Sequence, residues 1–194
     1  IEITETSLPA FKKALTEGTL DVGLASDVST IPYGSLVQVL REEEVFLAIS
    51  MFHPYALTHP SGTPITAEEV KTNFADDSLL LSKKGASLRM IGDQFFDSCG
   101  FEPVAVCETN NISATRSMVA QNAGVAFISE SCSVNRNHIA YYPLSPAMKR
   151  LNLVVRQKDW VLNEPEQAFM DQILNYFKQN TEHPYLAEKY SISF

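Results

Sequence analysis

The sequence has few cysteines and no long hydrophobic run. Of its 194 residues only three are cysteines, Cys99, Cys107 and Cys132, and no two of them form a CxxC pair. An odd number of cysteines without metal-ligand spacing is typical of reduced thiols in the cytosol, so neither a disulfide framework nor a metal site is expected. No run of about 18 apolar residues occurs, which excludes a helix that crosses a membrane.

Positive charge is also scarce. Fifteen Lys and Arg stand against 23 Asp and Glu, which gives a net charge of -8. DNA-binding domains gather positive charge on one face, so this acidic chain is not expected to contact DNA itself. The chain opens without a signal-peptide pattern and without a methionine, which indicates a piece of a longer or processed protein.

Catalytic and cofactor-binding motifs are missing as well. The sequence contains no GxSxG, P-loop, HExxH or GxGxxG pattern. Its four histidines lie far apart at no ligand spacing, and we interpret them as surface or hinge residues: His53, His59, His138 and His183. We therefore expect no catalytic residue, no metal and no cofactor.

Strand and helix patterns alternate along nearly the whole chain. Apolar runs predict strands at 1–5, 20–25, 45–50, 78–81, 104–107, 125–128, 139–142 and 151–155. Start and stop signals predict helices at 7–18, 66–72, 87–100 and 112–124, and a last one from Asn163 whose core face is Phe169, Ile173, Tyr176 and Phe177. This alternation predicts an α/β fold with parallel sheets.

Two proline-containing crossings interrupt the alternation. They are His53-Pro54 with His59-Pro60, and the segment 143–146. Read as hinges, they predict a lobe I of residues 1–52 and 148–194 and a lobe II of residues 53–147. A two-lobed α/β protein with a double crossover has its expected ligand site between the lobes.

Three turns that follow a strand and precede a helix carry polar side chains. They span residues 5–7, 82–87 and 108–111. In open α/β sheets ligands bind at the carboxyl ends of strands, where helix N-termini offer free N–H groups and partial positive charge. Lys83 and Lys84 add cations, so we predict a site for a small anion, above all a carboxylate. The alternative, that the serines and asparagines of these turns are only caps, stays open.

In order and spacing, several segments resemble the effector-binding domain of LysR-type transcriptional regulators. Residues 15–25, LTEGTLDVGLA, are close to the family pattern L-x-x-G-x-L-D-x-x-I. Residues 44–50 match the family too, with His53-Pro54 at its first crossing, and residues 79–96 have its small and polar turn. Residues 108–128 are similar to the family's E-x-x-x-x…V-x-x-G-x-G-I-x-x-L-P. Such a domain normally opens with one more strand and helix than this chain has, and Ser129-Glu130-Ser131 stands where the family has Pro.

The resemblance implies a two-lobed fold of the type 2 periplasmic-binding-protein kind and a cytoplasmic regulator that is not an enzyme. Its small-molecule effector would bind between the lobes and change the geometry of a homodimer, or of a tetramer in the full-length parent. DNA would be contacted only through the helix-turn-helix domain, which this chain lacks, and no membrane is involved. The effector-binding residues that the resemblance implies are Thr6, Ser7, Ser82, Lys83, Gly85, Ser87, Glu108, Thr109 and Asn110.

Two other classes of protein stay open at this point. A periplasmic solute-binding protein has the same two-lobed clamp, although the odd number of cysteines and the segment 20–25 favour the regulator. An enzyme on this fold, such as a dehydratase of the prephenate type, is the other. Thr115-Arg116 is similar to a Thr-Arg pair of those enzymes, but Ser117 follows where their motif has Phe. A turnover assay would separate this last class from the others.

Overall fold

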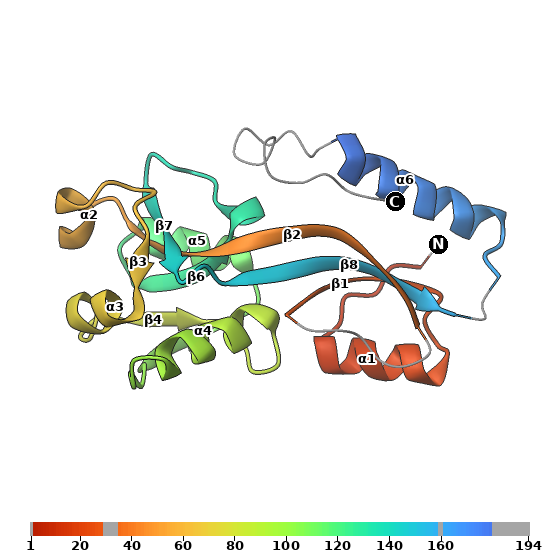
Figure 1. The fold of residues 1–194 in the computed structure, drawn as a ribbon, viewed down its shortest axis with the longest axis horizontal. Helices are drawn as coiled ribbons and strands as arrows, with labels where there is room; N and C mark the ends of the chain where they lie inside the picture. Colours follow the sequence, from red (N-terminus) through yellow and green to blue (C-terminus); the bar gives the residue numbers. More distant parts are fainter. Residues whose placement is uncertain (1, 29–34, 159–160, 180–194) are drawn as a thin grey trace. The chain divides into compact units, whose positions relative to one another are not determined.

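The computed structural model describes residues 2–28, 35–158 and 161–179. They form two compact units: unit 1 comprises the described parts of Ile1–Glu42 and Leu151–Phe194, and unit 2 is Glu43–Arg150. The chain enters unit 2 within strand β2 (Ser35–Ser50) and leaves it within β8 (Lys149–Gln157) (Figure 1). The lobe boundaries inferred from the prolines, 52/53 and 147/148, stay a prediction.

Unit 1 has a helix on each face of a small sheet. Strand β1 (Val22–Asp27) pairs antiparallel with β8. Side chains alternate along a strand, and those of β8 follow this rule. Leu153 and Val155 pack against helix α1 (Leu8–Glu17), whereas Val154 between them packs against helix α6 (Glu164–Gln179).

The predicted ends of α1 are confirmed. Ser7 is the N-cap, with its Oγ accepting from the backbone N–H of Ala10 at 3.4 Å. Gly18 ends the helix with a φ of 69°, in the left-handed region that glycine adopts without steric cost. The predicted start of α6 is confirmed too, because Asn163 Oδ1 accepts from the N–H of Glu166 at 3.0 Å.

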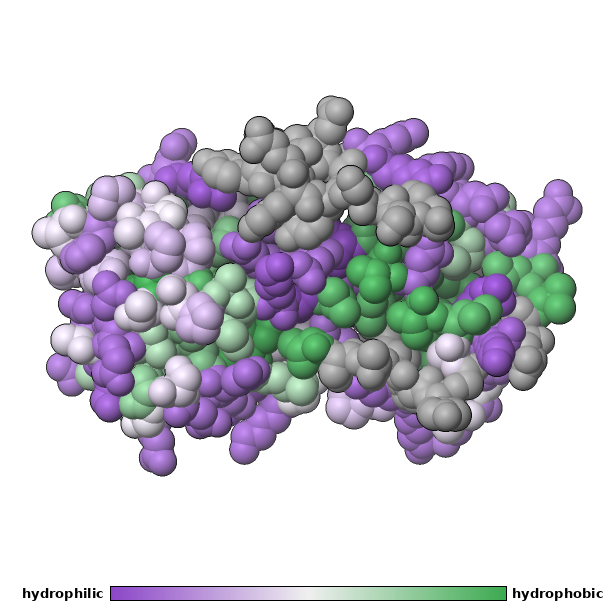
Figure 2. Space-filling model, in the orientation of Figure 1, coloured by the Kyte–Doolittle hydropathy of each residue, from purple (hydrophilic) through white to green (hydrophobic). Residues whose placement is uncertain are grey.

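Three details predicted for unit 1 are wrong. Residues 2–6 form neither strand nor helix and are exposed, because their alternation finds no partner strand. Strand 20–25, predicted to be buried and parallel, is β1, an antiparallel strand at the end of the sheet order with Leu24 exposed. Tyr176 of α6 is 62% exposed, and Met170 takes its place in the core. Figure 2 shows apolar side chains gathered on the visible face of unit 1.

Unit 2 is built on a mixed sheet. Strand β4 (Leu79–Leu81) pairs parallel with β5 (Ala105–Glu108) and with β6 (Val125–Ser129). Strand β2 pairs antiparallel with β6 and with β7 (Ile139–Ser145). The predicted α/β class is confirmed, but only part of the sheet is parallel. The short strand β3 (Ile65–Thr66) pairs with β7.

The helices of unit 2 follow its strands. They are α2 (Pro54–Thr58), α3 (Ala67–Asn73), α4 (Ser87–Asp97), α5 (Ile112–Ala120) and the 3₁₀ turn Glu130–Cys132. Helix α3 begins with the predicted capping box, in which Thr66 and Glu69 each bond the other's backbone N–H.

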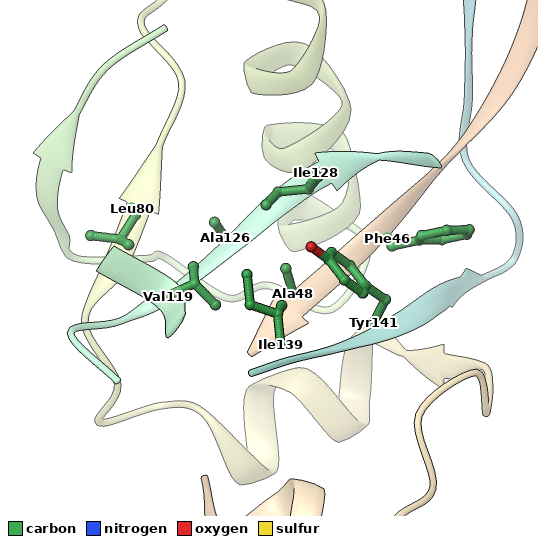
Figure 3. Packing of buried hydrophobic residues seen from close by; sticks show 8 residues of the cluster. All are labelled: Phe46, Ala48, Leu80, Val119, Ala126, Ile128, Ile139 and Tyr141. Carbon is green, nitrogen blue, oxygen red and sulfur yellow. The ribbon is translucent and has the colours of Figure 1, made fainter. Parts of the chain in front are cut away.

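A buried cluster joins the sheet of unit 2 to α5. Side chains from β2, β4, β6, β7 and α5 converge in it (Figure 3). Its buried members are Phe46, Ala48, Leu80, Val119, Ala126, Ile128, Ile139 and Tyr141. This core fixes the strand ends from which the turns before α4 and α5 emerge.

Candidate ligand-binding site

Unit 2 contains a pocket of about 210 Å³ at the carboxyl ends of its parallel strands. Its polar lining residues are Ser82, Ser87, Thr109, Asn110, Thr115, Ser129 and Arg150, and its apolar ones are Leu80, Ala86, Leu88, Ile112, Phe127 and Cys132. Parallel strands end at one edge of a sheet, so the helices that follow them begin together there. The volume lies below the roughly 300–1,000 Å³ of sites for drug-sized ligands, so a small metabolite fits it.

The start of α4 leaves polar groups unsatisfied at this pocket. Ala86 is the N-cap and has no side chain to accept a hydrogen bond. In the part of the chain that the structure describes, the N–H groups of Ser87 and Leu88 have no acceptor, and the hydroxyls of Ser82 and Ser87 have no partner. One interpretation of the sequence made Ser87 a helix cap. It is instead the first helical residue of α4, and it is 5% exposed.

The start of α5, unlike that of α4, is capped by side-chain hydrogen bonds. Asn111 Oδ1 accepts from the N–H of Ala114 at 3.0 Å, so Asn111 is an N-cap. Thr109 Oγ1 accepts from the N–H of Asn111 at 3.1 Å, and Thr115 donates its hydroxyl to the Asn111 carbonyl at 3.1 Å. The Thr109 hydroxyl keeps its own hydrogen for a ligand, because here it acts as the acceptor.

Arg150 is the one cation among the described lining residues. Its Nε donates to Glu43 Oε1 at 2.7 Å, and its Nη2 donates to Ser129 Oγ at 2.8 Å. Glu43 is fully buried, and its Oε2 accepts from the N–H of Ser131 at 3.1 Å. Burial alone raises the pKa of Glu43, but the charge of Arg150 and the hydrogen bonds from Ser131 and Arg150 outweigh it and lower that pKa. Arg150 is thus held rigidly beside the pocket.

The two turns around the pocket are tied to each other. The N–H of Lys83 donates to Asn110 Oδ1 at 3.0 Å. Arg89 Nη1 donates to Glu108 Oε1 at 2.6 Å and to the Ser82 carbonyl at 3.3 Å. These bonds fix the positions of Ser82 and Asn110 before any ligand arrives.

Of the nine effector-binding residues that the family resemblance implies, the structure brings four together at this pocket. Ser82, Ser87, Thr109 and Asn110 line the pocket. Lys83, Gly85 and Glu108 lie in the same turns, and Glu108 is engaged by Arg89. Thr6 and Ser7 belong to unit 1, and Ser7 caps α1. Contact of each of these nine residues with the effector stays a prediction.

Sequence reasoning missed Ser129 and Arg150. Ser129 was noted only as a departure from the family's Pro, and Arg150 belongs to no motif and lies 68 positions beyond Ser82 in the sequence. Glu43 is the middle one of three consecutive glutamates, so the sequence alone did not single it out as the buried partner that needs a cation.

No metal site or membrane helix is found in the part of the chain that the structure describes. The described residues hold no group of His, Cys, Asp and Glu that could bind a metal ion, and none of their helices could cross a membrane. The three cysteines are free thiols.

Known proteins with similar sequences are helix-turn-helix regulators. The transcriptional regulator YybE of Bacillus subtilis (strain 168) is 24% identical over 167 residues, which cover 85% of this chain and 54% of YybE. The chain spans about half the length of the curated relatives that it matches.

Solved structures share the fold. The effector-binding domain of QuiR in complex with shikimate has a TM-score of 0.68 at 17% identity, over 90% of this chain and 80% of that one. The regulatory domain of CcmR from Synechocystis PCC6803, in complex with 2-PG, has a TM-score of 0.72 at 18% identity, over 90% and 82%. These similarities confirm the predicted type 2 periplasmic-binding-protein-like fold.

The resemblance noted in the sequence is therefore confirmed. The family model of the LysR substrate binding domain matches residues 1–178, from the start of the chain into the last turn of α6. Since this match takes in nearly the whole chain, the protein belongs to the LysR substrate-binding domain family.

Proposed function

We propose that this chain is the effector-binding region of a LysR-type transcriptional regulator and that the unit 2 pocket takes a small organic carboxylate. One observation carries the proposal: α4 begins at the pocket with two N–H groups, of Ser87 and Leu88, that no described residue accepts. Buried polar groups are normally paired, so such groups at a pocket need a partner from outside the chain.

The charge around the pocket favours an anion. A helix N-terminus stabilises a nearby negative charge by about 0.3–1 kcal/mol, and more where it is partly buried. Arg150 adds a fixed cation, although Glu43 neutralises much of its field. Hydrogen bonds to a charged ligand add about 1.5–3 kcal/mol each. Less the cost of association, two or three such contacts fit a Kd in the micromolar to millimolar range.

The relatives support a role in gene regulation. YybE is a regulator of the helix-turn-helix type, and the domains of QuiR and CcmR were solved with small molecules bound. We infer a cytoplasmic protein without enzymatic activity, which forms a homodimer, or a tetramer at full length. It would contact DNA through a helix-turn-helix domain outside this chain. An effector can change DNA binding only if it binds two conformations of the regulator with different affinity.

Calorimetry with paired ligands tests the pocket. We expect small carboxylates to bind and their primary amides to bind at least about tenfold more weakly, which is 1.4 kcal/mol. Ser87→Ala should weaken carboxylate binding while leaving the melting temperature nearly unchanged, because Ser87 is not a cap. Ser117→Ala is the matched control, since Ser117 bonds within α5 and does not line the pocket.

Two results would contradict the proposal. Amides that bind as tightly as carboxylates would remove the anion preference. Equal carboxylate affinity in wild type and Ser87→Ala would remove Ser87 from the site.

A further inference from the structure

Arg150 keeps one guanidinium nitrogen for a ligand. Its Nε donates to Glu43 and its Nη2 donates to Ser129, whereas its Nη1 has no acceptor in the part of the chain that the structure describes. Nη1 is not among the described side-chain nitrogens that are buried without a partner, so part of its surface remains accessible. Since the side chain of Arg150 lines the unit 2 pocket and is 14% exposed, the two N–H groups of Nη1 can donate to a molecule in that pocket.

The positive charge of Arg150 is already balanced by Glu43. Burial alone raises the pKa of Glu43, but Arg150 and Ser131 outweigh it and lower this pKa, so Glu43 is an anion at neutral pH. A ligand carboxylate at Arg150 would share the guanidinium with this buried anion, and two carboxylates at one site repel each other. An uncharged oxygen accepts the same hydrogen bond without that repulsion.

The carboxylate of a ligand has a better place at the start of α4. The N–H groups of Ser87 and Leu88 have no acceptor among the described residues, and no acid belongs to the described lining of the pocket. The start of α4 and Arg150 border one pocket of about 210 Å³, so a small molecule that fills it meets both. The pocket therefore offers a place for one carboxylate and a separate donor for one uncharged oxygen.

We propose that Arg150 determines the specificity of this pocket and selects monocarboxylates that carry an uncharged oxygen, a hydroxyl or a carbonyl. The selection rests on the proposed function, because it takes the carboxylate to lie at the start of α4. The ligand class is then the small hydroxy and oxo acids, in preference to dicarboxylic acids and to acids with a plain hydrocarbon chain. The uncharged oxygen of such an acid accepts from Nη1 of Arg150.

Calorimetry of the 194-residue chain with four-carbon acids tests the selection. The probes are butyrate, its monohydroxylated forms and the dicarboxylate succinate, all at neutral pH and constant ionic strength. We expect one of the hydroxybutyrates to bind about tenfold more tightly than butyrate, because it forms one further hydrogen bond to a charged donor. Succinate should bind no more tightly than butyrate, because its second carboxylate meets the charge of Glu43.

Arg150→Lys assigns the preference to Arg150. Lysine keeps a cation beside Glu43 but lacks the planar guanidinium and its Nη1. We expect the roughly tenfold advantage of the hydroxybutyrate over butyrate to disappear in this variant, with butyrate affinity nearly unchanged. The double variant Arg150→Met with Glu43→Gln removes the pair as a whole, and it should lose the same advantage.

Ser87→Ala is the matched comparison at the other end of the ligand. It should weaken butyrate and the hydroxybutyrate alike and leave their ratio unchanged, because Ser87 lies where the carboxylate binds. Ser117→Ala should change neither affinity, since Ser117 bonds within α5 and does not line the pocket.

The outcomes separate this selection from the proposed carboxylate pocket. Butyrate that binds as tightly as every hydroxybutyrate would overturn the selection and leave the carboxylate pocket standing. Succinate that binds more tightly than the other acids would overturn it too, because Arg150 would then take a second carboxylate. A preference that both Arg150 variants retain would assign the contact to another residue. Binding of none of these acids would contradict the proposed function itself.

Discussion

Among the residues that the structure describes, unit 2 buries its core more completely than unit 1 does. The largest fully buried side chains of these residues all belong to unit 2, between Leu47 and Tyr142. The described clusters of unit 1 hold four buried residues each. Unit 1 also leaves apolar side chains exposed on β1 and on the first half of β2: Leu24, Leu36, Val37 and Val39.

The more complete core of unit 2 explains why this unit can keep unsatisfied polar groups at a binding site. An uncapped helix end costs stability, typically about 1 kcal/mol. In unit 2 a large core packs directly beneath the turns and offsets that cost, so the open end of α4 can serve a ligand. In unit 1 the corresponding helix end, at Ser7, is capped.

The largest difference in stability between the two units is expected when the cation of a buried ion pair is removed from each. Arg150→Met leaves Glu43 buried without its cation, which should cost about 3–5 kcal/mol of unfolding free energy. Lys12→Met in unit 1 should cost less, because the Lys12 side chain is 32% exposed and its charge is partly solvated. Urea unfolding measures both. Equal losses would contradict this contrast, and adding Glu43→Gln to Arg150→Met should recover most of the loss.

The dependence of stability on pH tests the role of the buried Glu43. In the folded chain Arg150 and Ser131 outweigh burial and lower the pKa of Glu43. The unfolded chain therefore binds this proton more readily, so Glu43 stabilises the fold above its ordinary pKa of 4.5 and loses this effect as the pH falls through the lowered value. Glu43→Gln should flatten the fall of the melting temperature below about pH 4.5.

The control for this titration is Glu69→Gln. Hydrogen bonds from Thr66 lower the pKa of Glu69 as well, but Glu69 lies near the surface, where solvent screens its charge. A slope that changes equally in both variants would show that Glu43 is not the main acid-sensitive group.

Four helix starts and the end of α1 were predicted correctly because their signals are local, whereas α4 ends at Asp97 and α5 at Ala120, before the predicted Gly100 and Gly124. Ser7, Gly18, Thr66, Asn111 and Asn163 all lie at the ends that the sequence indicated. A cap depends on side-chain oxygens within three residues, which the sequence displays directly.

Strand pairing was predicted less well because it depends on distant residues. Alternation at 1–5 did not reveal whether a partner strand exists, and the antiparallel pairing of β1 with β8 joins residues more than 120 positions apart. The site divides in the same way. Ser82, Ser87, Thr109 and Asn110 follow from local turns, whereas Arg150 reaches the pocket only through the long return of the chain.

Adding a cap to α4 should separate stability from binding. Ala86→Asp supplies an oxygen that can accept from the free N–H groups, so the unfolding free energy should rise by about 1 kcal/mol. The same carboxylate occupies and repels the place of an anionic ligand, and carboxylate affinity should fall strongly. Urea unfolding and calorimetry measure the two effects. Higher stability with unchanged affinity would show that the ligand does not use the α4 end.

Removing the cap of α5 is the matched comparison for Ala86→Asp, which adds a cap to α4. Asn111 already accepts from Ala114, so Asn111→Ala should lower the unfolding free energy by about 0.5–2 kcal/mol.

The smallest effect on folding is expected at the edge of the unit 2 sheet, where the proposed homodimer can be tested. Strand β5 ends the sheet order of the described residues. Val104 precedes this strand and Val106 belongs to it, and their side chains are 76% and 57% exposed. Exposed edge strands pair with other chains, and a lysine on the edge opposes such pairing. Val106→Lys should therefore change the unfolding free energy by no more than about 0.5 kcal/mol, as surface substitutions do, yet shift the protein toward monomer in sedimentation at tens of micromolar. Val161→Lys in unit 1, at a position 89% exposed, should leave the dimer intact. A wild-type chain that sediments as a monomer would contradict the homodimer, and a Val106→Lys variant that stays dimeric would place the interface elsewhere.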